Sequence, residues 1–107
     1  MCSSDLEAKV KKQVKALLTQ LGAYYVMPVT GGYGRQGVPD FLVCYKGRFI
    51  GIETKAGKGK TTALQDMNLQ AIGTAGGVAL VVYENDIDKL RQTLVNIDGQ
   101  TEEIAGA

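Results

Sequence analysis

Apolar residues along the chain follow helical spacing in three stretches and strand-like runs in four. The helical stretches begin near Asp5, Thr61 and Asn85. The strand-like runs span residues 23–29, 39–45, 48–56 and 78–83. Their order predicts an α/β fold, α-β-β-β-α-β-α, in which helices flank a mixed sheet of about four strands.

Local signals refine this pattern. Thr61 or Thr62 can cap the second helix. Pro28 suits the end or an edge of the first strand, because proline has no N–H to donate. The continuous apolar run at residues 78–83 predicts a central strand that is buried on both faces. Residues 98–107 are expected to form a frayed tail.

Composition narrows the chemistry that this chain can perform. Its 107 residues are 45% hydrophobic, which suits a single domain over residues 1–107, and no apolar run reaches the ~20 residues of a membrane span. Cys2 and Cys44 lack the spacing of a zinc site, and the first residues do not resemble a secretory signal, so we expect a cytoplasmic protein. Histidine is absent. Catalysis would therefore use carboxylates, lysine, hydroxyls and a hard metal ion.

Charge is unevenly distributed along the chain. The net charge is +1, but residues 1–60 carry ten Lys and Arg against four Asp and Glu, whereas residues 61–107 carry two against seven. A polyanionic partner would explain the basic half, although ordinary surfaces also show such a skew.

The two β-type runs on either side of the Lys-Gly turn predict a hairpin that brings acidic residues together. We expect Tyr45 to pair with Arg48 across the turn. Asp40 then lies directly opposite Glu53, which shares a face with Lys55. Like charges about 5 Å apart destabilise a sheet, and a divalent cation would offset their repulsion. The alternative is a salt-bridge cluster on a solvated face.

This arrangement of Asp40, Glu53 and Lys55 suits phosphodiester hydrolysis. Mg²⁺ prefers one or two carboxylates and keeps positions for water and for phosphate oxygens of a substrate. Such an ion lowers the pKa of a bound water and stabilises charge on the phosphoryl group. The backbone carbonyl of Thr54 could add a neutral ligand, and Lys55 could orient the water or neutralise developing charge.

Two residues outside the hairpin are candidates for the same site. Glu7 lies within the apolar arc of the first helix, so it either points toward the metal site as a third carboxylate or pairs with Lys11 at i+4. Gln65 lies beside the apolar face of the second helix, where it either fills the helix border or hydrogen-bonds within the site.

Two loops carry groups suited to nucleic acid. Residues 30–37 combine glycines with Tyr33, which can stack on a base, and Arg35, which can bind a phosphate. Lys58 and Lys60 alternate with glycines after the hairpin and could contact phosphates. Both loops also fit an ordinary solvated surface.

Pro39-Asp40 followed by Glu53-Thr54-Lys55 resembles the signature of the PD-(D/E)xK nuclease superfamily. Gly37-Val38 before this motif, the run from Gly47 to Ile52 and the trailing Gln65 resemble, more specifically, the VRR-NUC domain over about residues 6–94. The resemblance implies a restriction-endonuclease-like core. It also implies that the aspartate and glutamate bind Mg²⁺ or Mn²⁺, that the lysine takes part in catalysis and that Glu7 and Gln65 act at the site.

The function implied by this resemblance is a metal-dependent DNA endonuclease that leaves a 3′-hydroxyl and a 5′-phosphate. Stand-alone VRR-NUC domains, known from phages, are associated with homodimers that act on branched DNA such as Holliday junctions. We therefore expect a homodimer, a branched duplex as substrate and, for a phage-encoded chain, the host cytoplasm as location. A non-catalytic nucleic-acid-binding module on the same scaffold and an unrelated α/β regulatory domain remain as alternatives.

Overall fold

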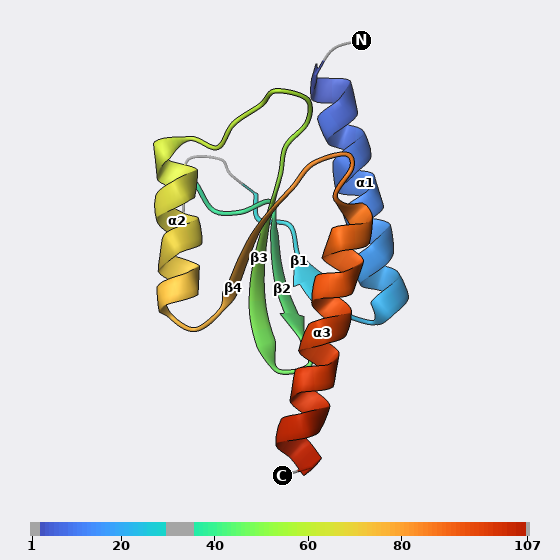
Figure 1. Ribbon diagram of the computed structural model, residues 1–107. Helices are drawn as coiled ribbons and strands as arrows, with labels where there is room; N and C mark the ends of the chain where they lie inside the picture. Colours follow the sequence, from blue (N-terminus) through green and yellow to red (C-terminus); the bar gives the residue numbers. More distant parts are fainter. Residues whose placement is uncertain (1–2, 30–35, 107) are drawn as a thin grey trace.

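The computed structural model describes residues 3–29 and 36–106 as a mixed sheet with helices on both faces (Figure 1). The helices are α1 (Ser3–Leu21), α2 (Ala63–Thr74) and α3 (Ile87–Gly106). The strands are β1 (Tyr24–Val26), β2 (Phe41–Tyr45), β3 (Arg48–Thr54) and β4 (Val78–Val82). This order confirms the predicted fold class.

The register of the sheet places residues of the hairpin as the sequence predicts. The strands lie in the order β1-β2-β3-β4. β2 is antiparallel to both β1 and β3, whereas β3 and β4 are parallel. Tyr45 pairs with Arg48, so the predicted register is confirmed. Lys46 and Gly47 have φ angles of 51° and 81°, as a two-residue hairpin turn with two left-handed positions requires.

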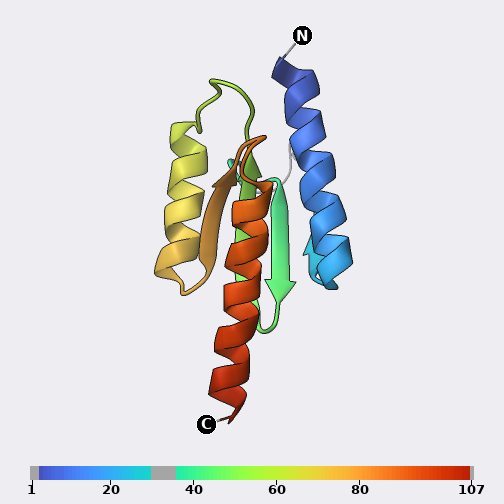
Figure 2. The same cartoon turned by 45° about the vertical axis from the view of Figure 1, so that its right-hand side comes forward.

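Two helices cover one face of the sheet and one helix covers the other (Figure 2). α1 contacts α3, β1 and β3, and α3 contacts β2, whereas α2 contacts β3 and β4. The main core lies between the sheet and the layer formed by α1 and α3. Its largest fully buried apolar side chains are those of Val10, Val14, Leu18, Phe41, Val43, Ile50, Ile52 and Leu94. The apolar arc predicted for the first helix thus faces the core.

The other face of β3 carries the polar residues. Successive residues of a strand alternate between faces, so Ile50 and Ile52 enter the main core while Gly51 and Glu53 face α2. A Cβ atom at Gly51 would lie 2.5 Å from Cδ1 of Ile72. α2 can therefore pack closely on β3 because position 51 has no side chain.

The position of β4 differs from the prediction. The apolar run at residues 78–83 predicted a central strand, but among the described residues β4 pairs only with β3 and forms an edge of the sheet. The first four residues of β4 are half-buried, and only Val82 is fully buried. The strand is apolar because α2 covers one of its faces and the main core covers the other, not because strands flank it on both sides.

Several element ends also differ from the predictions. β1 stops at Val26, before Pro28, which has no N–H for a strand ladder. α3 continues to Gly106, so the segment expected as a frayed tail has a helical backbone and extends past the sheet (Figure 1). Its residues include no proline that would end the helix. None of the helices in the described ranges is long and apolar enough to cross a membrane.

Candidate active site

Asp40 and Glu53 lie at the same end of the hairpin. Asp40 immediately precedes β2. The register that pairs Phe41 with Ile52 ends one residue short of Asp40 and Glu53, which are close enough for their charges to interact. The side chain of Asp40 is 25% exposed, whereas that of Glu53 is 3% exposed. The site therefore combines one accessible carboxylate with one buried carboxylate.

The environment of Glu53 disfavours its negative charge. Burial raises the pKa of Glu53 from 4.5 to about 7, and the charge of Asp40 adds to this rise while Lys55 opposes it. Oε2 of Glu53 accepts a hydrogen bond from Nε2 of Gln65 at 3.0 Å and lies 3.6 Å from Nζ of Lys55. Oε1 is buried and has no hydrogen-bond partner within the described parts of the chain. An unpartnered buried carboxylate oxygen is destabilising, so its chemistry suits a bound cation.

Thr54 orients Asp40 through two hydrogen bonds. Its backbone N–H donates to Oδ2 of Asp40 at 3.0 Å, and its hydroxyl donates to the same oxygen. Oδ1 lies 4.0 Å from Nζ of Lys11, a long and partly exposed ion pair that contributes little. The sequence predicts a role only for the backbone carbonyl of Thr54, whereas its N–H and hydroxyl are the groups that bond Asp40. A threonine placed diagonally across a hairpin from an aspartate can bond it, so the positions of Thr54 and Asp40 could have predicted this contact.

Gln65 both caps α2 and binds Glu53. Its Oε1 accepts a hydrogen bond from the N–H of Thr62 at 2.9 Å, and its own N–H donates to Oγ1 of Thr62 at 3.2 Å, which forms a capping box. Because Thr62 engages the amide oxygen, the amide NH₂ group is the part that faces Glu53. The structure thus places Gln65 in a hydrogen bond with a predicted site residue rather than at an inert helix border.

Lys55 and Glu7 line a hollow of about 240 Å³ together with Ala56 and Gly59. No group of three His, Cys, Asp or Glu residues within the described ranges is arranged to hold a metal ion. Glu7 therefore lies near Lys55 but does not form a three-carboxylate cluster with the acidic pair of the hairpin. Glu53 is instead hydrogen-bonded to Gln65 of α2, and Asp40 lies beside Lys11 of α1.

The predicted DNA-binding residues fall in two places. Lys58 and Lys60 are exposed on the loop after β3, and Gly59 between them lines the hollow beside Lys55. Tyr33 and Arg35 lie outside the described residues. The described end of their loop is attached to α2, because Nδ2 of Asn68 donates to the carbonyl of Gln36 at 3.0 Å.

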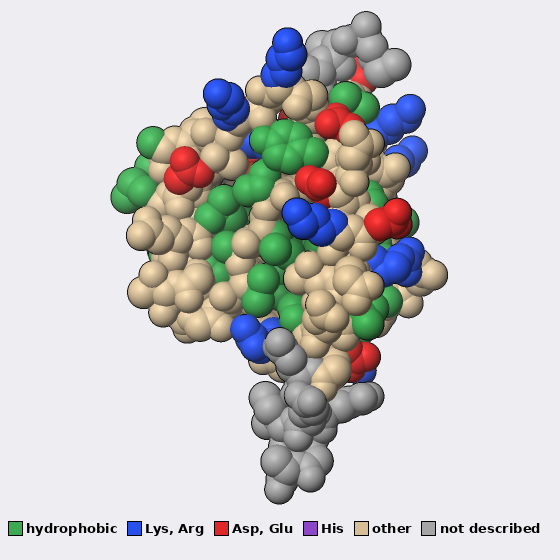
Figure 3. Space-filling view, in the orientation of Figure 1, with side chains coloured by type: hydrophobic (Ala, Val, Ile, Leu, Met, Phe, Trp, Pro, Cys, Tyr) green, Lys and Arg blue, Asp and Glu red, His purple; other side chains and the backbone are tan. Residues whose placement is uncertain are grey.

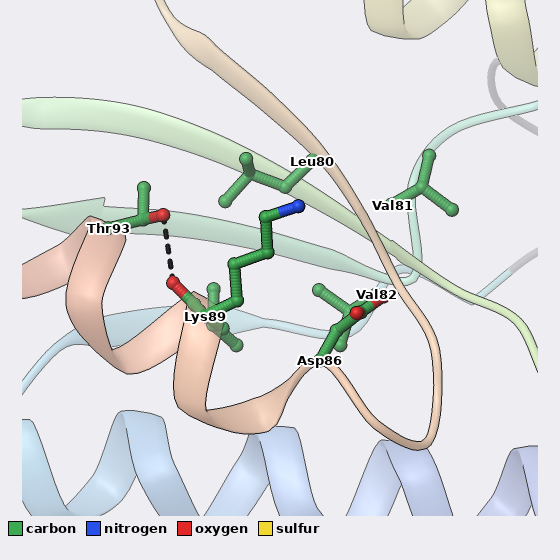
Figure 4. A pocket seen from close by; sticks show the side chains of 7 residues that line it. Leu80, Val81, Val82, Asp86, Lys89 and Thr93 are labelled. Carbon is green, nitrogen blue, oxygen red and sulfur yellow. Dashed lines mark hydrogen bonds between the residues drawn. The ribbon is translucent and has the colours of Figure 1, made fainter.

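A separate hollow of about 150 Å³ lies between β4 and α3, and Lys89 and Thr93 of α3 border it (Figure 4). Its other lining residues are Leu80, Val81, Val82, Asp86 and Leu90. None of the predicted site residues borders it. With one lysine, one carboxylate and a mostly apolar wall, it resembles a gap in packing more than a catalytic site.

Comparisons with known proteins agree with this geometry. No model of a protein family and no curated protein matches the chain. A solved structure described as "VRR_NUC domain" matches with a TM-score of 0.69 and 27% identity, over 80% of this chain and 94% of that chain. The element order and this match show an α/β nuclease-like fold. More specifically, they support a VRR-NUC domain, which confirms the resemblance predicted from the sequence.

Proposed function

We propose that this chain is a metal-dependent DNA endonuclease that hydrolyses phosphodiester bonds. The observation that carries the proposal is the buried, unpartnered Oε1 of Glu53 beside Asp40 within the described structure. In each carboxylate one oxygen is held by a neighbouring side chain, Gln65 for Glu53 and Thr54 for Asp40. Two such carboxylates are the donor set that Mg²⁺ or Mn²⁺ accepts while keeping positions for water and phosphate.

Asp40 and Glu53 would hold the ion, with the carbonyl of Thr54 as a neutral ligand. When bound, the ion would supply positive charge at the phosphoryl group and lower the pKa of a coordinated water. Lys55 borders the hollow, where its ammonium can donate to a phosphate oxygen or to the attacking water. Glu7 borders the same hollow and would add a carboxylate beside Lys55 from the α1 side.

The remaining site residues would either orient the Glu53 carboxylate or bind the DNA. Gln65 keeps one oxygen of Glu53 engaged and so determines which oxygen is available to the ion. Lys58 and Lys60 would bind backbone phosphates beside the hollow, and Tyr33 and Arg35 would contact a base and a phosphate.

Cleavage of a branched DNA duplex with and without EDTA tests the proposal. We expect cleavage that requires Mg²⁺ or Mn²⁺ and disappears in Glu53→Gln, while Asp88→Asn, which removes an exposed carboxylate of α3, cleaves normally. Lys55→Ala should retain metal binding in calorimetry and lose cleavage. Loss of metal affinity in Lys55→Ala would contradict the role assigned to this lysine. Binding of DNA without cleavage in any divalent metal would identify a non-catalytic nucleic-acid-binding module instead.

We further propose that the substrate is branched and that two copies of the chain act together. Support comes from β4, whose five residues form an uncharged edge that, among the described residues, no other strand covers. Figure 3 shows apolar side chains in the middle of the face between α2 and α3, where this strand lies. Edge strands are usually protected by charge, proline or a bulge, and β4 has neither charge nor proline.

A second copy suits this edge better than an unrelated strand. Antiparallel pairing centred on Leu80 would place valine opposite valine at both ends of β4, with no like charges opposed. We expect light scattering to give a dimer at micromolar concentration and Ala79→Lys to give a monomer, while Gln92→Lys on exposed α3 leaves the dimer intact. A monomeric wild type, or equal cleavage of linear and branched duplexes, would overturn this part of the proposal.

A further inference from the structure

The segment that follows β3 is hydrogen-bonded to the segment that follows β4. The two strands are parallel, so their carboxyl ends lie side by side. The hydrogen bonding continues one residue beyond β3, because the N–H of Lys55 donates to the carbonyl of Val82, the last residue of β4, at 3.0 Å. The next residues of each segment, the loop at residues 57–60 and the pair Tyr83-Glu84, therefore face each other at the edge of the candidate site.

Tyr83 and Glu84 bind this loop at two points. The hydroxyl of Tyr83 donates to the carbonyl of Gly59 at 2.7 Å. The N–H of Gly57 donates to the Glu84 carboxylate, at 2.9 Å to Oε2 and 3.2 Å to Oε1. The two contacts lie on either side of Lys58, so they restrict the backbone from which this lysine projects.

The loop itself has the conformation of a tight turn. The N–H of Gly59 donates to the carbonyl of Ala56 at 3.0 Å, and Gly57 has a φ of 58°, in the left-handed region that favours glycine. A loop that alternates glycine with lysine has high conformational entropy when it is free. The contacts from Tyr83 and Glu84 therefore reduce the freedom of the loop before any ligand binds.

Lys58 and Lys60 are available to an anion. Both are exposed, and neither forms an ion pair with the described residues. Glu84 is engaged by the Gly57 amide, so it acts as an acceptor for the backbone rather than as an ion-pair partner for the lysines. Gly59 lines the same hollow as Lys55, which puts the loop next to the reactive end of the proposed site.

We propose that Tyr83 and Glu84 are positioning residues that hold Lys58 and Lys60 for DNA phosphates next to the scissile bond. This inference rests on the proposed nuclease function and extends it to two residues outside the metal and lysine set. Neither residue touches the reacting atoms. Their effect passes through the loop, because a lysine on an ordered backbone loses less entropy when it binds a phosphate.

Kinetic measurements distinguish a positioning role of Tyr83 and Glu84 from a role in fold stability alone. If they only stabilise the fold, Tyr83→Phe and Glu84→Ala should lower thermal stability and change KM and kcat together. If they position the lysines, the variants should raise KM for DNA by about threefold to tenfold, the size expected for one lost hydrogen bond, with kcat within about twofold. Hydrogen exchange at the Gly57 amide should become faster in Glu84→Ala, which has no acceptor for it.

The decisive experiment is a double-mutant comparison in the full chain with a branched duplex and Mn²⁺. Tyr83→Phe and Glu84→Ala are measured in the wild type and in a Lys58→Ala, Lys60→Ala background, with Tyr24→Phe on exposed β1 and Asp88→Asn on α3 as matched controls. We expect the rise in KM to vanish in the background that lacks both lysines. A rise of equal size there, or no rise in the wild type, overturns the inference while leaving the nuclease intact. A wild type that cleaves no DNA overturns the proposed function itself. If Tyr83→Phe does not fold, the KM of Glu84→Ala in the two backgrounds tests the inference.

Discussion

Gln65 donates a hydrogen bond to one carboxylate oxygen of Glu53 and leaves the other oxygen without a partner among the described residues. The same glutamine caps α2 through Thr62, so the start of a helix and the candidate metal-binding residue form one hydrogen-bonded unit. A flexible side chain held at both polar atoms of its amide has little rotamer freedom left. The position of the free oxygen of Glu53 therefore depends on the packing of α2 against the sheet.

The stability of the folded chain should depend on pH through Glu53. Its pKa is about 7 in the folded chain against 4.5 ordinarily, so the folded state keeps a proton that the unfolded chain has already lost. The contribution of Glu53 to stability should fall as pH rises from about 4.5 to about 7 and level off above that. Urea denaturation in EDTA measures this, with Glu53→Gln as the control. Identical pH profiles for the two proteins would rule the effect out.

Metal binding should displace a proton from Glu53 below about pH 7. The ion requires the ionised carboxylate, while burial and Asp40 favour the protonated form. We expect Mn²⁺ to bind about tenfold more weakly at pH 6 than at pH 8. Calorimetry in two buffers with different ionisation enthalpies should detect the released proton. Proton uptake, or an affinity that does not change with pH, would contradict the assignment of Glu53 as a ligand.

Two substitutions of Gln65 separate its capping role from its role at the site. Glutamate at this position retains a capping box but cannot donate to Glu53 and adds a like charge beside it. Gln65→Glu should therefore lose cleavage with a helix stability close to wild type. Gln65→Ala loses both roles, and we expect it to be destabilised by about 1 kcal/mol. Thermal denaturation and cleavage assays check both variants, and normal cleavage in Gln65→Glu would refute the role at the site.

The hydroxyl of Thr54 should matter for metal affinity through Asp40. Thr54→Val keeps the shape and the backbone N–H of this buried residue but removes one of its two donors to Oδ2. We expect metal affinity to fall by about tenfold, as for the loss of other groups that orient metal ligands. Thr54→Ser retains the hydroxyl and should bind metal nearly as well as wild type. Equal affinities for the valine and serine variants would show that the backbone N–H alone orients Asp40.

Sequence by itself determined the local features of this protein. The alternation of side chains across the Lys-Gly turn is enough to predict that Tyr45 pairs with Arg48 and, one step beyond β2, that Asp40 faces Glu53. A short hairpin has one favourable register when one face is buried. The first helix follows from the spacing of its apolar residues. A threonine cap for α2 at position 61 or 62 follows from residue type, and the structure has it at Thr62.

Only the tertiary structure decided how distant segments meet. The apolar pattern of β4 is the same for a central strand and for an edge strand covered by helices, so the pattern predicted the wrong position. The pairing of Thr54 with Asp40 and of Glu84 with the Gly57 amide depends on strand order and loop path, which no periodicity encodes. The meeting of Glu7 with Lys55 at one hollow likewise depends on how α1 packs against the sheet. Local patterns reflect backbone geometry over a few residues, whereas these contacts depend on how the whole chain packs.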